Sequence, residues 1–177
     1  MKTTSLVMAL GIAAGVFATP AMAAGNLVQF EGGIGVIPVS TGQGTATTST
    51  TVNRNFVRGV SPPGQIWVIK DLRAEVKDDG RIRVHGKGLL LGGGNNIGGN
   101  ANASVYATLF CEVPPAPTAP QTFIERSTAP AGVPLDPDGD FKIDDTLDNP
   151  TSECPSPVLL IRNAANKAWF AAGIPRR

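Results

Sequence analysis

Residues 70–91, KDLRAEVKDDGRIRVHGKGLLL, decide the fold that this sequence predicts. Apolar and charged residues alternate over 72–77 and again over 81–85. A period of two is typical of a β-strand that turns one face to the core and the other to solvent. Asp78, Asp79 and Gly80 separate the two runs and indicate a turn, so the stretch is predicted to form a β-hairpin.

The length of the turn decides which residues of this hairpin face one another. A two-residue loop would set Val76 opposite Arg83 and mix apolar with charged side chains. A three-residue loop, with Gly80 in the left-handed conformation, sets Val76 opposite Ile82 and pairs Glu75 with Arg83 on the outer face. We predict the three-residue loop, because a slip of one residue would expose the whole apolar set.

The first residues of the chain have the pattern of a secretory signal peptide. Lys2 gives a positive start, an apolar run follows over 5–17, and Ala21 and Ala23 are the small residues of a cleavage site. The apolar run is shorter than the roughly 20 residues that a membrane-spanning helix needs. We therefore expect a signal peptide over 1–23, a single all-β domain over 24–177 with no transmembrane segment, and a secreted or periplasmic location.

The charge of the mature chain argues against a nucleic-acid partner. Removal of Lys2 from the 15 basic side chains leaves 14, which equals the number of acidic side chains. Nucleic-acid binding proteins typically carry a strong excess of positive charge. We expect no nucleic acid among the partners.

The rest of the mature chain predicts further strands. Short apolar segments with turn signals between them give roughly nine to eleven strands, which is typical of a β-sandwich or a closed barrel. The predicted fold is a single-domain antiparallel β-sandwich or closed barrel. Residues 65–69 form a continuous apolar run, which predicts an interior strand covered on both faces. Residues 133–143 and 158–172 are predicted to form two more hairpins.

Cys111 and Cys154 are the 2 cysteines of the chain. In an exported protein, two cysteines most simply form one disulfide. We predict a disulfide between them.

One acidic segment has the composition of a cation site. It holds Asp136, Asp138, Asp140 and Asp144, with Asp145 beside them, and calcium binds six to eight oxygen atoms. The order of residues departs from the EF-hand pattern, because Gly139 stands between the second and third aspartates and no Glu follows. The alternative is a polar turn at Asp138 and Gly139. The expected cofactor is therefore none, with calcium as the alternative.

The outward face of the predicted hairpin carries a group of cations. They are Arg73, Lys77, Arg81, Arg83, His85 and Lys87, with Glu75 as the one carboxylate among them. This face suits an anionic partner, or self-association with the acidic segment 136–145. The alternative is an ordinary solvated sheet face.

The sequence predicts no catalytic residues. His85 is the single histidine, so Ser-His-Asp or Cys-His catalysis would have to use it. The nucleophile-elbow pattern G-x-S-x-G is absent from the sequence. We expect a protein that is not an enzyme.

Four aromatic residues raise the question of a sugar-binding surface: Trp67, Tyr106, Trp169 and Phe170. The apolar runs around both tryptophans favour core packing instead. We expect an exported non-enzymatic β-domain that acts as a structural or interaction protein of the cell exterior. Its partner would be a second copy, an extracellular protein or a glycan. The alternative is a ligand-binding module for calcium or carbohydrate.

Overall fold

The computed structural model describes residues 24–37, 55–113 and 121–176. The predicted signal peptide lies outside these residues. The described part of the chain is all-β and contains no helix. Its eleven strands are β1 (Asn26–Gly35), β2 (Trp67–Val68), β3 (Asp71–Lys77), β4 (Arg81–Lys87), β5 (Leu90–Leu91), β6 (Ser104–Val113), β7 (Thr122–Ser127), β8 (Val133–Pro134), β9 (Phe141–Thr146), β10 (Val158–Asn163) and β11 (Trp169–Pro175).

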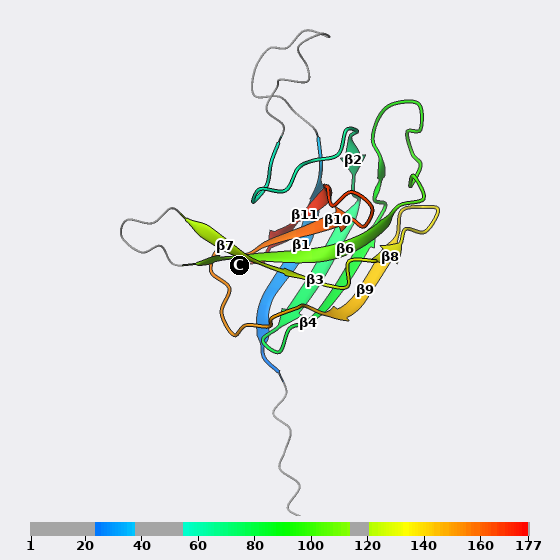
Figure 1. The fold of residues 1–177 in the computed structure, drawn as a ribbon. Coiled ribbons are helices and arrows are strands. Elements are labelled where there is room, and N and C mark those ends of the chain that lie inside the picture. The colour runs from blue at the N-terminus through cyan, green and yellow to red at the C-terminus, as the bar shows by residue number, and fades with distance from the viewer. Residues whose placement is uncertain (1–23, 38–54, 114–120, 177) are drawn as a thin grey trace, which may run out of the picture.

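Nine of the strands form one antiparallel sheet that curls into a half-barrel (Figure 1). The strand order is β7-β6-β10-β11-β1-β3-β4-β9, and β8 pairs with β6 beyond the end of β7. The all-β class that the sequence predicts is confirmed, and its architecture is this curled sheet. The concave side of the curl holds the core, where the largest buried side chains are Phe170, Leu72, Ile82, Leu89 and Leu109.

The hairpin of β3 and β4 has the predicted register. Val76 lies opposite Ile82, and Glu75 lies opposite Arg83. Gly80 has φ +87°, the left-handed conformation that the three-residue loop requires, and its N–H donates to the Lys77 carbonyl at 3.0 Å. The apolar set of both strands is buried, so the period of two does place one face of the hairpin in the core.

The two ends of the curled sheet approach one another. The Asp145 carboxylate on β9 accepts a hydrogen bond from the Ala129 N–H at 2.9 Å, just beyond β7. Asp148 accepts from the Ser127 N–H at 2.6 Å and donates its own N–H to the Ser127 carbonyl at 3.0 Å. Two aspartates thus join β9 to the end of β7 where a β-ladder would otherwise run.

The prediction of an interior strand over 65–69 is wrong. The structure forms only the two-residue strand β2, which pairs with β5 in a separate small sheet. Trp67 points inward and stacks on Phe170 with ring centroids 3.9 Å apart, whereas Val68 is 47% exposed. A Cβ on Gly35 would lie 2.3 Å from the Trp67 carbonyl oxygen, so β2 crosses close over β1 and buries one face only.

The predicted hairpin over 133–143 is correct in its turn and wrong in its pairing. The Gly139 N–H donates to the Asp136 carbonyl at 2.8 Å, which closes the turn. Its two arms then separate, because β8 pairs with β6 and β9 pairs with β4 at the far end of the sheet. The predicted hairpin of β10 and β11 is confirmed, with Leu160 opposite Ala172.

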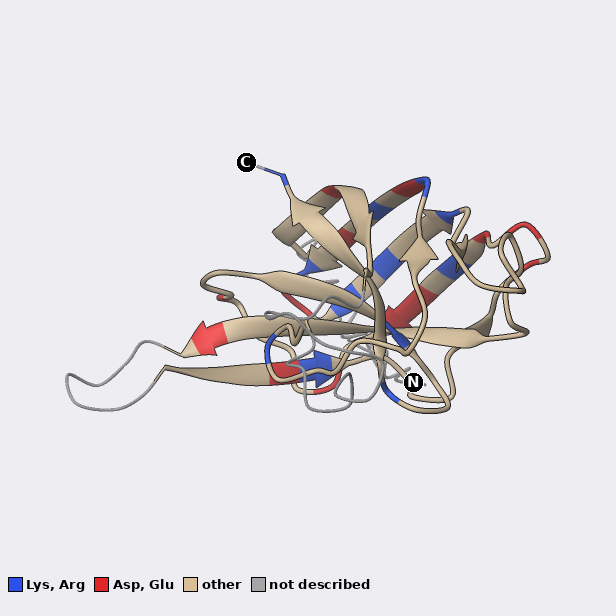
Figure 2. Cartoon of the chain, turned by 90° about the horizontal axis from the view of Figure 1, so that it is seen from above, with Lys and Arg blue, Asp and Glu red and all other residues tan. Residues whose placement is uncertain are grey.

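The convex side of the sheet has two different halves. Over β6, β10 and β11, the side chains of Phe110, Leu160 and Trp169 are buried. The chain near residues 55–61 contacts this half, because the Trp169 Nε1–H donates to the Asn55 carbonyl at 3.1 Å and its backbone N–H to the Ser61 carbonyl. The half over β1, β3, β4 and β9 carries the charged residues of the hairpin (Figure 2).

Candidate binding surfaces

Four of the six predicted patch cations have a carboxylate partner in the same molecule. Lys77 pairs with Glu75 at 2.8 Å, and Arg83 pairs with Asp144 on β9 at 3.4 Å. The two remaining ion pairs are Arg73 with Asp71 at 3.5 Å and Arg81 with Asp79 at 2.7 Å. The hydrogen bond from Lys77 also lowers the pKa of Glu75 below its ordinary value.

Acidic and basic residues alternate in one cross-strand row of this half of the sheet. Glu75, Arg83 and Asp144 lie side by side on β3, β4 and β9, in the order acid, base, acid. Figure 2 shows these neighbouring blue and red segments. Ion pairs between exposed side chains contribute little free energy, so the arrangement mainly balances charge within the face. The structure thus brings part of the predicted acidic segment onto the same face as the predicted basic patch.

His85 and Lys87 occupy the same exposed face of β4. His85 lies between Arg73 on β3 and Lys142 on β9, and Lys87 lies opposite Asp71. The imidazole thus has a cation as its direct cross-strand neighbour on each side. Neither of these two neighbours is a carboxylate, the group that orients the histidine ring in a Ser-His-Asp triad.

The five aspartates of the acidic segment make different local contacts. Asp140 accepts from the Gly88 N–H at 2.9 Å, and Asp138 caps the turn by accepting from the Asp140 N–H at 3.3 Å. Asp144 pairs with Arg83, Asp145 holds Ala129, and Asp136 contributes backbone groups to the turn. Within the described residues, no three acidic, histidine or cysteine side chains gather in a way that suits a metal ion.

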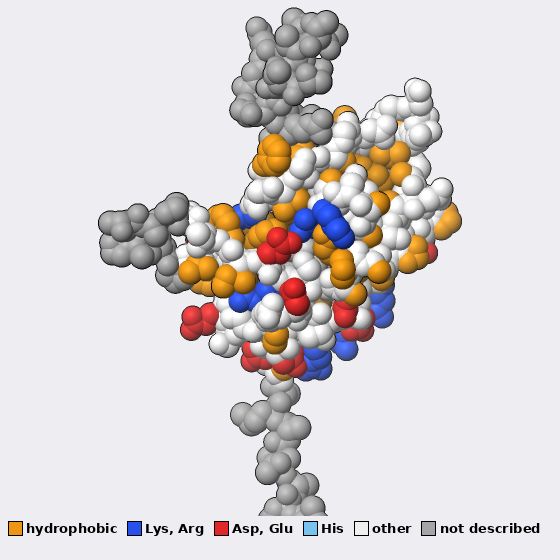
Figure 3. All heavy atoms as spheres, in the orientation of Figure 1, with side chains coloured by type: hydrophobic (Ala, Val, Ile, Leu, Met, Phe, Trp, Pro, Cys, Tyr) orange, Lys and Arg blue, Asp and Glu red, His pale blue; other side chains and the backbone are white. Residues whose placement is uncertain are grey.

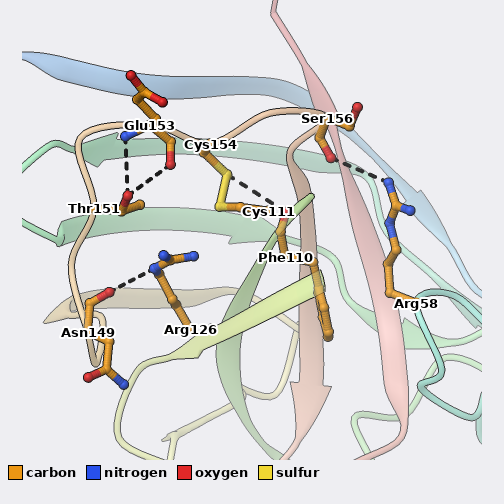
Figure 4. Close-up of a disulfide and its surroundings, with 9 residues drawn as sticks. All are labelled: Arg58, Phe110, Cys111, Arg126, Asn149, Thr151, Glu153, Cys154 and Ser156. Atoms are coloured by element: carbon orange, nitrogen blue, oxygen red, sulfur yellow. Dashed lines mark hydrogen bonds between the residues drawn. A yellow bond between two sulfur atoms is a disulfide. The ribbon is translucent and has the colours of Figure 1, made fainter. Parts of the chain in front are cut away.

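The predicted disulfide between Cys111 and Cys154 is confirmed (Figure 4). It joins β6 to the loop between β9 and β10 and closes a separation of 43 residues, with the two Cα atoms 4.7 Å apart. Near it, Arg126 donates from Nε to the Asn149 carbonyl at 2.7 Å. The disulfide and this hydrogen bond together hold the loop against β6 and β7.

The four aromatic side chains that raised the possibility of a sugar surface are all buried. Trp67 and Phe170 stack on one another, and both line an open hollow of about 450 Å³. Asn102, Ser104 and Asn163 also line this hollow. Core packing of these aromatic residues, which their apolar surroundings favoured, is what the structure shows.

Sequence reasoning missed a second hollow, of about 330 Å³, on the convex side. Its lining includes three cations, Arg58, Arg162 and Lys167, and one carboxylate, Glu125. Figure 3 shows basic, acidic and hydrophobic side chains side by side on the face over β6 and β7. The residues come from three separate parts of the chain, so no local pattern signals the site.

The side chain of Arg162 is held in place in this hollow by several contacts. Its Nη1 donates to the Glu125 carboxylate, and its Nε donates to the Lys167 carbonyl at 2.9 Å. The guanidinium also lies 5.4 Å from the centre of the Tyr106 ring, and Lys167 Nζ lies 5.1 Å from the same ring. Burial raises the pKa of Tyr106 above its ordinary value, although the charge of Arg162 acts in the opposite sense.

The strand β7 forms the open edge of the sheet. The Thr128 N–H donates to the Ala107 carbonyl, and bonded pairs alternate along an antiparallel ladder. Phe123 and Glu125 therefore point their backbone N–H and C=O groups away from β6. In the described part of the chain these groups have no backbone partner. Ile124, between them, is 44% exposed.

No protein-family model, curated protein or solved structure matches this chain. Among the residues that the structure describes, none belongs to a helix that would cross a membrane.

Proposed function

We propose that this chain is an exported, non-enzymatic β-domain that acts as a structural or interaction protein of the cell exterior and associates with a second copy of itself through β7. Export is supported by the signal-peptide pattern and by the disulfide, which persists most readily in oxidising compartments. The observation that carries the association is the open backbone edge at Phe123 and Glu125.

An open strand edge is a site for adding another strand. Unpaired N–H and C=O groups on an edge recruit a further chain unless charge, a proline or a covering loop prevents it. At the Ser127 end of β7 the edge is already occupied, because Asp148 bonds to the Ser127 N–H and C=O, so the outward groups of Phe123 and Glu125 are the ones available to a second chain. Pairing of β7 with β7 about a two-fold axis uses the same edge in both copies, so it closes a dimer rather than extending a fibre.

A two-fold axis at Ile124 satisfies both the backbone and the side chains. In antiparallel pairing around this axis, Phe123 of one copy and Glu125 of the other form hydrogen-bonded pairs. The two copies of Ile124 then face each other in a non-hydrogen-bonded pair, where side chains approach most closely. This pairing gives the half-exposed Ile124 an apolar contact across the interface.

The experiment is a comparison of molar mass by light scattering after size exclusion. The wild type is expected to be a dimer, and Ile124→Lys a monomer, because two lysines would meet at the axis. Ile174→Lys is the matched control, because Ile174 is equally exposed at 43% but lies on the interior strand β11. A monomeric wild type at all accessible concentrations would rule out the proposed association.

A second variant tests the backbone contribution separately. Phe123→Pro removes an outward N–H without touching the ladder to β6, and proline is tolerated on edge strands. Phe123→Ala removes the same ring, including its contact with the Arg58 guanidinium 3.9 Å away, but keeps the N–H. We expect the proline variant to be a monomer and the alanine variant to remain a dimer.

The alternative function, a carbohydrate-binding module, is favoured by the hollow of about 450 Å³ beside Trp67. Its lining combines Trp67 with Asn102 and Asn163, a combination that suits neutral polar ligands. Titration with soluble polysaccharides, followed by tryptophan emission, tests this alternative. An emission spectrum that does not change at saturating polysaccharide excludes it.

A further inference from the structure

We propose that the hollow lined by Arg58, Arg162 and Lys167 binds a small molecule through an anionic oxygen group such as a carboxylate or a phosphate. The volume of about 330 Å³ is in the range of small-ligand sites. The hollow borders the edge of β7, because Glu125 gives its side chain to the lining and its backbone to the proposed association. Binding of an anion is nevertheless measured separately from the oligomeric state, so the two proposals can fail independently.

The charge of the lining favours an anion. The lining has three cations and one carboxylate, Glu125. A second carboxylate, Glu112, pairs with Arg58 at 3.3 Å. When both carboxylates are counted, one positive charge remains in excess. Lys167 supplies this excess, because no carboxylate pairs with it in the described part of the chain. Its ammonium group lies over the Tyr106 ring at 5.1 Å, beside the hollow.

The geometry of Arg162 makes the site rigid. Only 9% of this residue is exposed, and its guanidinium is held by the Glu125 carboxylate and by the Lys167 carbonyl. The Thr108 hydroxyl lies a further 3.5 Å from Nη1. A cation that is already oriented loses little conformational entropy when a ligand binds, which favours affinity.

The backbone gives an independent reason to assign a role to the other two cations. Arg58 has φ +51° and Lys167 has φ +64°, the left-handed conformation that long side chains rarely adopt. Among the described residues with positive φ other than glycine, these are the only two cations, and both line this hollow. Strained conformations of this kind concentrate at binding and active sites.

The test uses sodium phosphate and sodium acetate as probes, with sodium chloride at the same ionic strength as reference. Affinity is measured by isothermal titration calorimetry, and the site is located from amide NMR shifts. We expect phosphate or acetate to shift the amides of Gly59 and Ala168, which line the hollow. Shifts at the β3–β4 face instead would mean nonspecific surface binding and would overturn the proposal.

The decisive variant is Lys167→Asn, because asparagine tolerates the left-handed conformation and removes the charge. Loss of one charged contact is expected to weaken binding about tenfold or more. Arg81→Asn, on the exposed hairpin face, removes the same charge far from the hollow and should leave the affinity unchanged. Equal affinity in Lys167→Asn and wild type would overturn the proposal, as would no binding of either probe to the wild type. A thermal melt of each variant checks folding.

Discussion

Arg162 on β10 and Glu125 on β7 form an ion pair that spans the intervening strand β6. The neighbour of Glu125, Arg126, points to the opposite face of the sheet and is buried to a similar degree, with 7% exposed against 9% for Arg162. Arg126 donates one hydrogen bond, from Nε to the Asn149 carbonyl, and its Nη1 has no partner within the described residues. Two equally buried arginines thus differ in how well their charge is compensated.

Truncating these arginines should change the free energy of unfolding in different ways. Arg162→Met removes a charged hydrogen bond and is expected to lower it by about 2 kcal/mol. Arg126→Met removes a buried charge whose Nη1 has no partner among the described residues, and burying an incompletely bonded charge costs free energy, so we expect little change or a gain. Urea denaturation of both variants measures the difference. A loss for Arg126→Met as large as that for Arg162→Met would contradict this account of Arg126.

The disulfide should be the largest single covalent contribution to stability. Loss of the bond between Cys111 and Cys154 frees a loop with a sequence separation of 43 residues. The chain-entropy model assigns about 4 kcal/mol to closing a loop of this size. We expect the Cys111→Ala/Cys154→Ala variant to show this loss in denaturant titrations and to be insensitive to added reductant. A wild type whose midpoint is unchanged by full reduction would be inconsistent with the expectation.

Tyr106 should ionise at higher pH in the folded protein than in the unfolded chain. It is the 1 tyrosine of the chain, so the absorbance of tyrosinate reports on it alone. Burial raises the pKa of Tyr106 from its ordinary value of 10.0. The neutral form is thus favoured on folding, and its contribution to stability is complete below pH 10.0 and is lost as the pH rises through the folded pKa. A folded midpoint at or below that of the denatured chain would refute the prediction.

Calcium should not stabilise the protein. Asp140, Asp144 and Asp145 direct their carboxylates to Gly88, Arg83 and Ala129. A ligand that binds only the folded state raises the melting temperature in proportion to its binding free energy. We expect the same midpoint in excess EDTA and in millimolar calcium. A calcium-dependent rise would show that the acidic segment rearranges around the ion.

The parts of the fold that the sequence predicts well are those set by local pattern. The register of β3 and β4 follows from the alternation of apolar and charged residues and from the conformation that Gly80 adopts. The bond between Cys111 and Cys154 follows from the presence of two cysteines. In both cases a few residues determine the result, because their chemistry permits only one strand register or one cysteine pairing.

The parts that the sequence does not predict depend on contacts between distant segments. The run within 65–69 has the same sequence pattern whether one face or both faces of the strand are covered. In the structure the stacking of Trp67 on Phe170 buries one face only. The hollow around Arg162 combines residues near 58, 125 and 167, which only the curl of the sheet brings together. The basic hairpin face was visible in the sequence, but its pairing with Asp144 requires the position of β9.

Light scattering after size exclusion decides whether two copies of this chain pair through β7. We expect a dimer whose molar mass is the same at low and at high salt, because backbone hydrogen bonds and Ile124 form the contact rather than exposed charges. Ile124→Lys should be a monomer, while Ile174→Lys should remain a dimer. A wild-type monomer, or a dimer that dissociates in high salt and is unaffected by Ile124→Lys, would contradict the claim.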